Sequence, residues 1–182
     1  STLSDTFLKV ASIFFIGILI LAFTTDSIAT GTKEGERAPA LDGAAYSGNV
    51  WSSFDFNDEF DTTWDGNASS DWIMIEFMDT DCPYCVRSAD LYGEASEAFH
   101  GSNADWNGAQ VNFFASATQL DITGHESSRE EIAAFRDKST GQECASADCA
   151  NRGGSAHDLV TYIDDLDQEN MDKWDIKGTP TY

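Results

Sequence analysis

Residues 71–98 decide the fold: DWIMIEFMDTDCPYC, residues 71–85, is followed by VRSADLYGEASEA, residues 86–98. The first part is apolar and rich in residues that favour β-structure, which predicts a buried strand. Apolar or small residues recur at a roughly helical spacing from Val86 to Ala98, which predicts a helix. The two cysteines Cys82 and Cys85 therefore lie where a strand passes into a helix.

This position favours thiol chemistry. The unpaired N–H groups and the positive end of the helix dipole face the first cysteine. Because they stabilise a thiolate, we expect the pKa of Cys82 to fall below the free value of about 8.5. Cys85, one turn later, is close enough to close a disulfide, so the pair has the geometry of a dithiol that cycles. Glu76, Asp79 and Asp81 oppose the thiolate electrostatically, which favours a reductant over a strong oxidant.

The strand, the C-x-x-C sequence and the helix together resemble the thioredoxin superfamily. Near the C-terminus, IKGTPT (residues 176–181) resembles the cis-proline loop of that family. Glu76 stands six residues before Cys82, at the offset where thioredoxins carry a buried carboxylate. GERAPALDG (residues 35–43) is similar to the corresponding stretch of membrane-anchored, extracytoplasmic thioredoxins of the TlpA/ResA type. The resemblance covers residues 35–182.

The resemblance implies an α/β fold of the thioredoxin type, with a central mixed sheet flanked by helices. It implies that Cys82 attacks the substrate, that Cys85 resolves the mixed disulfide by forming a Cys82–Cys85 bond, and that Glu76 transfers the proton of Cys85. A cis Pro180 would present the backbone of Thr179 to an extended substrate. Pro83 and Tyr84 would also contact the substrate.

The sequence departs from this family at two places. The dipeptide Pro83-Tyr84 is the one that glutaredoxins carry. The family also continues beyond the cis-proline with further strands and a helix, whereas this sequence ends at Tyr182. Either the sequence is a fragment, from which the C-terminal strands and helix are missing, or the protein lacks those elements. We expect a fragment, because a sheet without its last strands would leave an unpaired edge.

The charge balance excludes one class of function. The chain has 32 acidic and 10 basic residues and a net charge of −22, which repels nucleic acid, so we expect no nucleic-acid partner. The acidic residues are spread along the chain, as on a surface adapted to a salty environment. Steering of a basic partner protein is the other interpretation.

An uncharged segment, Val10 to Thr25, precedes the domain. As a helix its sixteen residues span about 24 Å, and Phe7 and Leu8 extend it toward the roughly 30 Å of a bilayer core. A cleavable signal peptide and a buried core helix are the alternatives. The predicted organisation is a transmembrane anchor or signal segment at 1–25, a linker at 26–38 and a domain at 39–182.

Residues 140–155 are predicted to be an inserted loop, closed by a Cys144–Cys149 disulfide. A second redox pair is the alternative, and a four-cysteine zinc site with Cys82 and Cys85 is a third interpretation. The x4 spacing suits zinc poorly, so we expect no metal and no cofactor. The three histidines, His100, His125 and His157, lack ligand spacing and are interpreted as surface residues.

The remaining pattern predicts strands at 109–117 and 159–163, and helices at 123–138 and 167–174. Ser127 or Ser128 would cap the first of these helices, whose charge order complements its dipole. The aromatic residues of 51–64 fit either a short strand or one helical face.

These observations predict an exported, membrane-tethered thiol–disulfide oxidoreductase. Its expected partners are cysteine-containing exported proteins, a membrane or soluble thiol redox partner, and the membrane itself through the N-terminal helix. A binding subunit of a membrane complex, with Cys82–Cys85 as a structural disulfide, is the main alternative. A peroxidase is a weaker one, because Thr80 and Arg87 around Cys82 imitate its required groups poorly.

Overall fold

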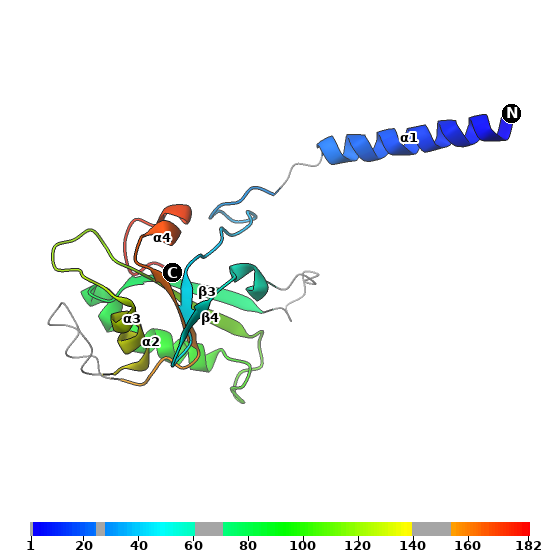
Figure 1. Ribbon diagram of the computed structural model, residues 1–182. Helices are drawn as coiled ribbons and strands as arrows, with labels where there is room; N and C mark the ends of the chain where they lie inside the picture. Colours follow the sequence, from blue (N-terminus) through cyan, green and yellow to red (C-terminus); the bar gives the residue numbers. More distant parts are fainter. Residues whose placement is uncertain (1, 25–27, 61–70, 140–153) are drawn as a thin grey trace. The chain divides into compact units, whose positions relative to one another are not determined.

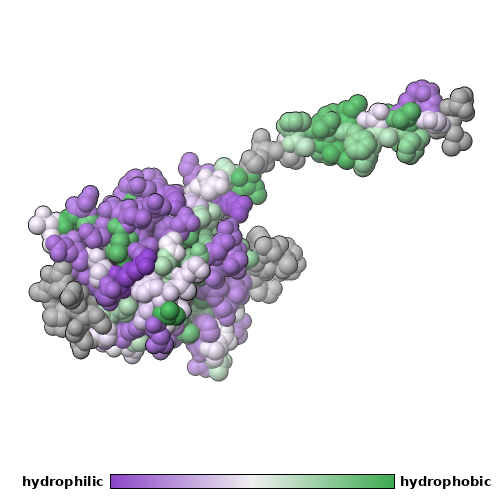
Figure 2. All heavy atoms as spheres, in the orientation of Figure 1, coloured by the Kyte–Doolittle hydropathy of each residue, from purple (hydrophilic) through white to green (hydrophobic). Residues whose placement is uncertain are grey.

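The computed structural model describes residues 2–24, 28–60, 71–139 and 154–182 (Figure 1). Its contacts divide the chain into two units, Ser1–Ala38 and Pro39–Tyr182. The first unit contains helix α1, Thr2–Thr24. The section Ser4–Thr24 is long and apolar enough to cross a membrane, and Figure 2 shows hydrophobic residues over most of its visible length. The predicted apolar segment is thus a helix of membrane-spanning length.

The second unit is built on a mixed sheet of five strands in the order β2-β1-β5-β4-β3. The strands are β1 (Ala44–Tyr46), β2 (Trp51–Ser53), β3 (Trp72–Asp79), β4 (Val111–Thr118) and β5 (Val160–Asp165). β3, β4 and β5 are parallel, whereas β1 runs antiparallel to both of its neighbours. The connections between parallel strands contain helices, as such crossovers require.

Helices cover both faces of this sheet. They are α2 (Pro83–Ala98), α3 (Arg129–Asp137), α4 (Glu169–Lys173) and the 3-10 helix η1 (Phe56–Glu59). One buried cluster joins α2 and α3 to the face of β3 that carries Met74 and Met78. A second cluster joins η1 and α4 to the opposite face, which carries Phe77. The expected α/β architecture, a mixed sheet flanked by helices, is confirmed.

The individual elements follow the sequence closely, with one clear error. The strands expected at 109–117 and 159–163 are β4 and β5, displaced by one or two residues. The helix expected at 123–138 begins only at Arg129, because Ser128 caps it by accepting a hydrogen bond from the Glu131 N–H at 3.2 Å. In the 51–64 stretch, β2 and η1 account for the described residues, and 61–70 lie outside them.

The free edge of β3 receives the end of the chain. Phe77 N–H donates to the Thr181 carbonyl at 2.8 Å, and Thr181 N–H donates back to the Phe77 carbonyl at 3.1 Å. This antiparallel pair fixes the position of the residues just before Thr181. Thr179 and Pro180 are thereby held near the junction of β3 and α2.

Candidate active site

Cys82 occupies the N-cap position of α2, at the junction that the sequence predicted. Its N–H donates to the Asp79 carbonyl at 3.1 Å. Its sulfur lies 3.5 Å from the carbonyl oxygen of Thr179, and the Thr179–Pro180 peptide bond is cis. The structure therefore brings Cys82, Thr179 and Pro180 together from opposite ends of the domain.

Cys85 lies one turn further along α2, with 1% of its surface exposed, against 5% for Cys82. Burial raises the pKa of the Cys85 thiol well above its ordinary range, and the nearby Cys82 thiol adds to the rise. Both cysteines are free thiols in this structure, so the expected Cys82–Cys85 disulfide is not formed here. The less buried thiol is thus the one at the helix terminus, where a thiolate is best stabilised.

The two residues between the cysteines are both exposed. Pro83 begins α2, where its fixed φ fits the first helical position. Tyr84 extends into solvent, and the guanidinium carbon of Arg87 lies 4.5 Å from the centre of its ring. Thr80, in contrast, is buried and its hydroxyl lies 2.7 Å from that of Ser127. The peroxidase interpretation needs Arg87 and Thr80 around Cys82. Arg87 instead packs against Tyr84, and the Thr80 hydroxyl pairs with Ser127.

Glu76 lies on β3, on the face covered by α2, and is 2% exposed. Burial raises its pKa to about 7, although hydrogen bonds with the Tyr182 and Ser88 side chains and the charge of Lys138 oppose the rise. Among the residues that the structure describes, no hydrogen-bond partner reaches its Oε1. Such a carboxyl exchanges protons near neutral pH.

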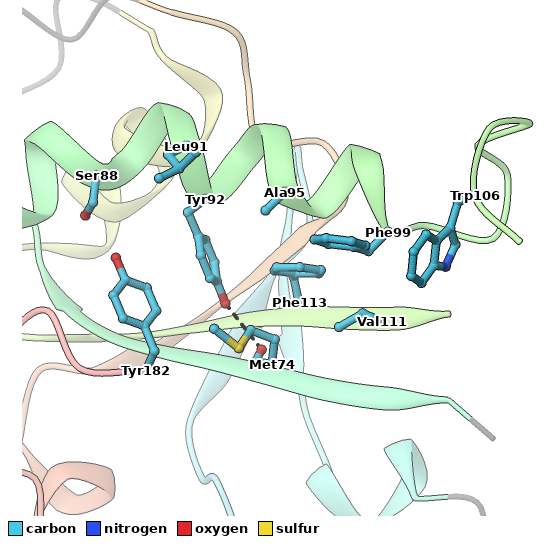
Figure 3. A pocket seen from close by; sticks show the side chains of 10 residues that line it. All are labelled: Met74, Ser88, Leu91, Tyr92, Ala95, Phe99, Trp106, Val111, Phe113 and Tyr182. Carbon is cyan, nitrogen blue, oxygen red and sulfur yellow. Dashed lines mark hydrogen bonds between the residues drawn. The ribbon is translucent and has the colours of Figure 1, made fainter. Parts of the chain in front are cut away.

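An apolar pocket of about 490 Å³ lies between α2 and the β3–β4 edge of the sheet (Figure 3). It is lined by Met74, Ser88, Leu91, Tyr92, Ala95, Phe99, Trp106, Val111, Phe113 and Tyr182. In Figure 3 the Tyr182 hydroxyl points toward Ser88, and both of these side chains also contact Glu76. The sequence did not reveal this pocket, because its lining comes from β3, α2 and the loop after it, β4 and Tyr182.

A second buried carboxylate, Asp79, ends β3 and is completely inaccessible to solvent. It accepts hydrogen bonds from the N–H groups of Asp81 and Leu120 and from Nδ1 of His125. The adjacent Asp81 carboxylate accepts a bond from the Glu126 N–H. No sequence pattern links residues 79–81 to 120–126, so this arrangement was not predicted.

The interpretation of the histidines as surface residues is wrong for two of the three, His157 and His125. His157 is buried, and its Nδ1 lies 2.7 Å from the Tyr162 hydroxyl. Burial lowers the pKa of His157 to about 4. His125 is partly buried against Asp79. Both histidines lie in connecting segments that fold back onto the sheet, which periodicity does not detect.

Two further predictions concern metal binding and the second cysteine pair, Cys144 and Cys149. Within residues 2–24, 28–60, 71–139 and 154–182, no group of three or more His, Cys, Asp or Glu side chains is arranged to hold a metal ion. Cys144 and Cys149 lie outside these ranges, so their predicted disulfide stays a prediction.

Comparison of the chain with protein-family models, with curated proteins and with solved structures found no match. The interpretation of the site therefore depends on its residues and their geometry.

Proposed function

We propose that this protein is a membrane-tethered thiol–disulfide oxidoreductase with a thioredoxin-like fold, which exchanges disulfides with cysteines of other exported proteins. The observation that carries the proposal is the 3.5 Å approach of the Cys82 sulfur to the Thr179 carbonyl, across 97 residues of sequence and next to the cis-peptide bond. In this proposal the substrate pairs with the half-buried Thr179-Pro180 backbone, so that its cysteine lies next to the Cys82 thiol.

The thioredoxin-like assignment is supported by the order of the elements around the site. A parallel strand, β3, passes through the C-x-x-C sequence into α2. The Thr179-Pro180 loop returns to this junction from the far end of the chain. This is the combination that the sequence resemblance to the thioredoxin superfamily implies.

The proposed reaction is thiol–disulfide exchange. The Cys82 thiolate attacks one sulfur of a substrate disulfide, the substrate S–S bond breaks, and one substrate thiolate leaves. The Cys85 thiolate then attacks the Cys82 sulfur of the mixed disulfide, which releases the second substrate thiol. The substrate gains two electrons and the protein keeps a Cys82–Cys85 disulfide. The reverse sequence oxidises a substrate dithiol.

Glu76 serves the second step in this proposal. Burial keeps Cys85 protonated, so its attack needs a base. Glu76 lies in the same buried layer, and the charges of both groups act on Tyr162 and Tyr182. With a pKa of about 7, its carboxylate can accept the Cys85 proton and later return it.

The location is part of the proposal. α1 supports a tether to the membrane, since it is long and apolar enough to cross one. The extracytoplasmic side follows from the resemblance of residues 35–43 to TlpA/ResA-type proteins. The partners would then be exported proteins with cysteines, together with a thiol redox partner that restores the dithiol.

One observation favours the alternative of a non-catalytic subunit with a structural disulfide. Cys82 is only 5% exposed, which fits a structural disulfide as well as a nucleophilic thiol that is shielded from solvent. The two functions differ in whether the bond forms and breaks while the domain stays folded.

The test is to equilibrate the full chain, in detergent micelles and with Cys144 and Cys149 replaced by Ser, in glutathione or dithiothreitol buffers. A reversible Cys82–Cys85 couple between about −270 and −120 mV supports the oxidoreductase, the lower limit marking a reductant and the upper an oxidant. A Cys85→Ser variant should accumulate a mixed disulfide on Cys82. If the bond is reduced only when the domain unfolds, the structural subunit replaces the enzyme.

A further inference from the structure

A segment far from the cysteines in sequence, Leu120–Ser127, is fastened to the turn that carries Cys82. The Leu120 N–H and the His125 Nδ1 each lie 2.8 Å from Asp79 Oδ2. The Glu126 N–H lies 2.9 Å from Asp81 Oδ2, and Ser127 Oγ lies 2.7 Å from Thr80 Oγ1. Asp79, which ends β3, and the two residues between it and Cys82 are thus all held by one segment.

The Asp79 carboxyl accepts hydrogen bonds from this segment and from its own turn. Both of its oxygens receive hydrogen bonds from N–H groups, Oδ1 from Asp81 and Oδ2 from Leu120 and His125. Because a carboxylate only accepts, the Nδ1 of His125 carries the hydrogen.

This buried charge lies close to the reactive thiol along the chain. The Asp79 carbonyl accepts the Cys82 N–H at 3.1 Å, so the carboxylate belongs to the residue that positions Cys82. A negative charge near a thiolate opposes its formation, and a donor aimed at that charge weakens the opposition. Among the described residues, the Asp79 carboxyl lies within hydrogen-bonding distance of two backbone N–H groups, of Asp81 and Leu120, and of one side chain, His125.

We propose that His125 is a positioning residue of the dithiol site: through Asp79 it fixes the turn that carries Cys82 and offsets the buried negative charge that opposes the Cys82 thiolate. The inference rests on the proposed function, because it assigns His125 to the same thiol. Its first readout, the alkylation of reduced Cys82, needs no redox partner.

Two substitutions separate the hydrogen bond from the shape of the ring. His125→Phe keeps a planar ring but loses the Nδ1 donor. His125→Asn keeps a donor near the position of Nδ1. Ser127→Ala is the matched control, because it removes a bond between the same segment and the same turn without touching the carboxylate.

The experiment uses the reduced full chain in detergent micelles, with Cys144 and Cys149 replaced by Ser. Each variant is alkylated at one fixed pH with neutral iodoacetamide and, separately, with anionic iodoacetate, and the modification of Cys82 is followed by peptide mass spectrometry. We expect His125→Phe to slow the iodoacetamide reaction on the order of threefold to tenfold. Iodoacetate should slow further, because the uncovered charge also repels the reagent.

His125→Asn should restore most of both rates, and Ser127→Ala should leave them unchanged. The reduction potential of the His125→Phe variant should become more negative, since a less stable thiolate favours the disulfide.

Three results would overturn the inference. The first is equal alkylation of His125→Phe and the unmodified chain. The second is equal slowing by His125→Phe and Ser127→Ala, which would make the segment a mechanical clamp alone. The third is equal slowing of both reagents, which would indicate altered access. If these occur while the Cys82–Cys85 couple is reversible, the proposed function stands. If Cys82 reacts only on unfolding, both proposals fail.

Discussion

Two buried carboxyl groups three residues apart on β3 have opposite surroundings. Asp79 is surrounded by three N–H donors at hydrogen-bonding distance. Glu76 has an oxygen without a partner among the described residues and a pKa raised to about 7 by burial. Two equally buried carboxyl groups therefore differ in how many hydrogen-bond donors surround them. The position of Asp79 suits a carboxyl that organises a turn. The position of Glu76 suits a carboxyl that accepts and releases a proton.

The largest effect is expected from Asp79→Ala. It leaves the N–H groups of Asp81 and Leu120 and the Nδ1 of His125 without their acceptor in a buried turn. We expect the free energy of unfolding to fall by about 4 kcal/mol, measured by urea denaturation. Asp79→Asn, which keeps one acceptor oxygen, should lose less. A loss below about 1 kcal/mol in the alanine variant would mean that water replaces the carboxylate.

Glu76→Gln should act in the opposite direction, and only at higher pH. The folded pKa of about 7 lies above the ordinary value of 4.5, so the folded state holds its proton longer than the unfolded state. Stability is therefore lost as pH rises from about 4.5 to 7, by about 3 kcal/mol in total. The glutamine variant lacks this loss and should gain stability relative to the unmodified chain at pH 8 but not at pH 4. Denaturation at both pH values measures it, and equal differences at both would contradict it.

The buried base His157 extends the comparison. Its folded pKa of about 4 lies below the ordinary 6.5, so the unfolded state binds the proton first. Stability is then lost as pH falls from about 6.5 to 4, by about 2 to 3 kcal/mol. His157→Gln keeps a polar group near the Tyr162 hydroxyl and should reduce this loss of stability at acidic pH, measured by urea denaturation. If the free energy of unfolding of the variant changes between pH 6.5 and 4 as much as that of the unmodified chain, other groups cause the loss. Asp165 is not one of them, because its raised pKa acts in the opposite direction.

Glu76 and Asp79 also show how much of the site could be predicted from the sequence. The strand, the cysteine pair and the helix follow from local patterns, so their positions were predicted within three residues. The burial of Glu76 was expected only through the family resemblance. Two of the groups that contact the Asp79 carboxyl belong to Leu120 and His125, and a helix was expected from residue 123. No local pattern marks a segment whose hydrogen bonds go to a strand 41 residues away. The pocket and the burial of His157 were missed for the same reason.

The smallest effect is expected from Ser127→Ala, which removes the neutral bond between Ser127 Oγ and Thr80 Oγ1. A neutral hydrogen bond contributes about 1 kcal/mol, roughly half of a charged one, so the loss should be about 1 kcal/mol or less in urea denaturation. The double variant Thr80→Val/Ser127→Ala should cost less than the sum of the two single variants, because they share one bond. Additive costs would mean that the two hydroxyls are satisfied separately. The difference between Ser127→Ala and Asp79→Ala therefore measures what the three contacts of the Asp79 carboxyl contribute beyond one neutral bond between the segment and the turn.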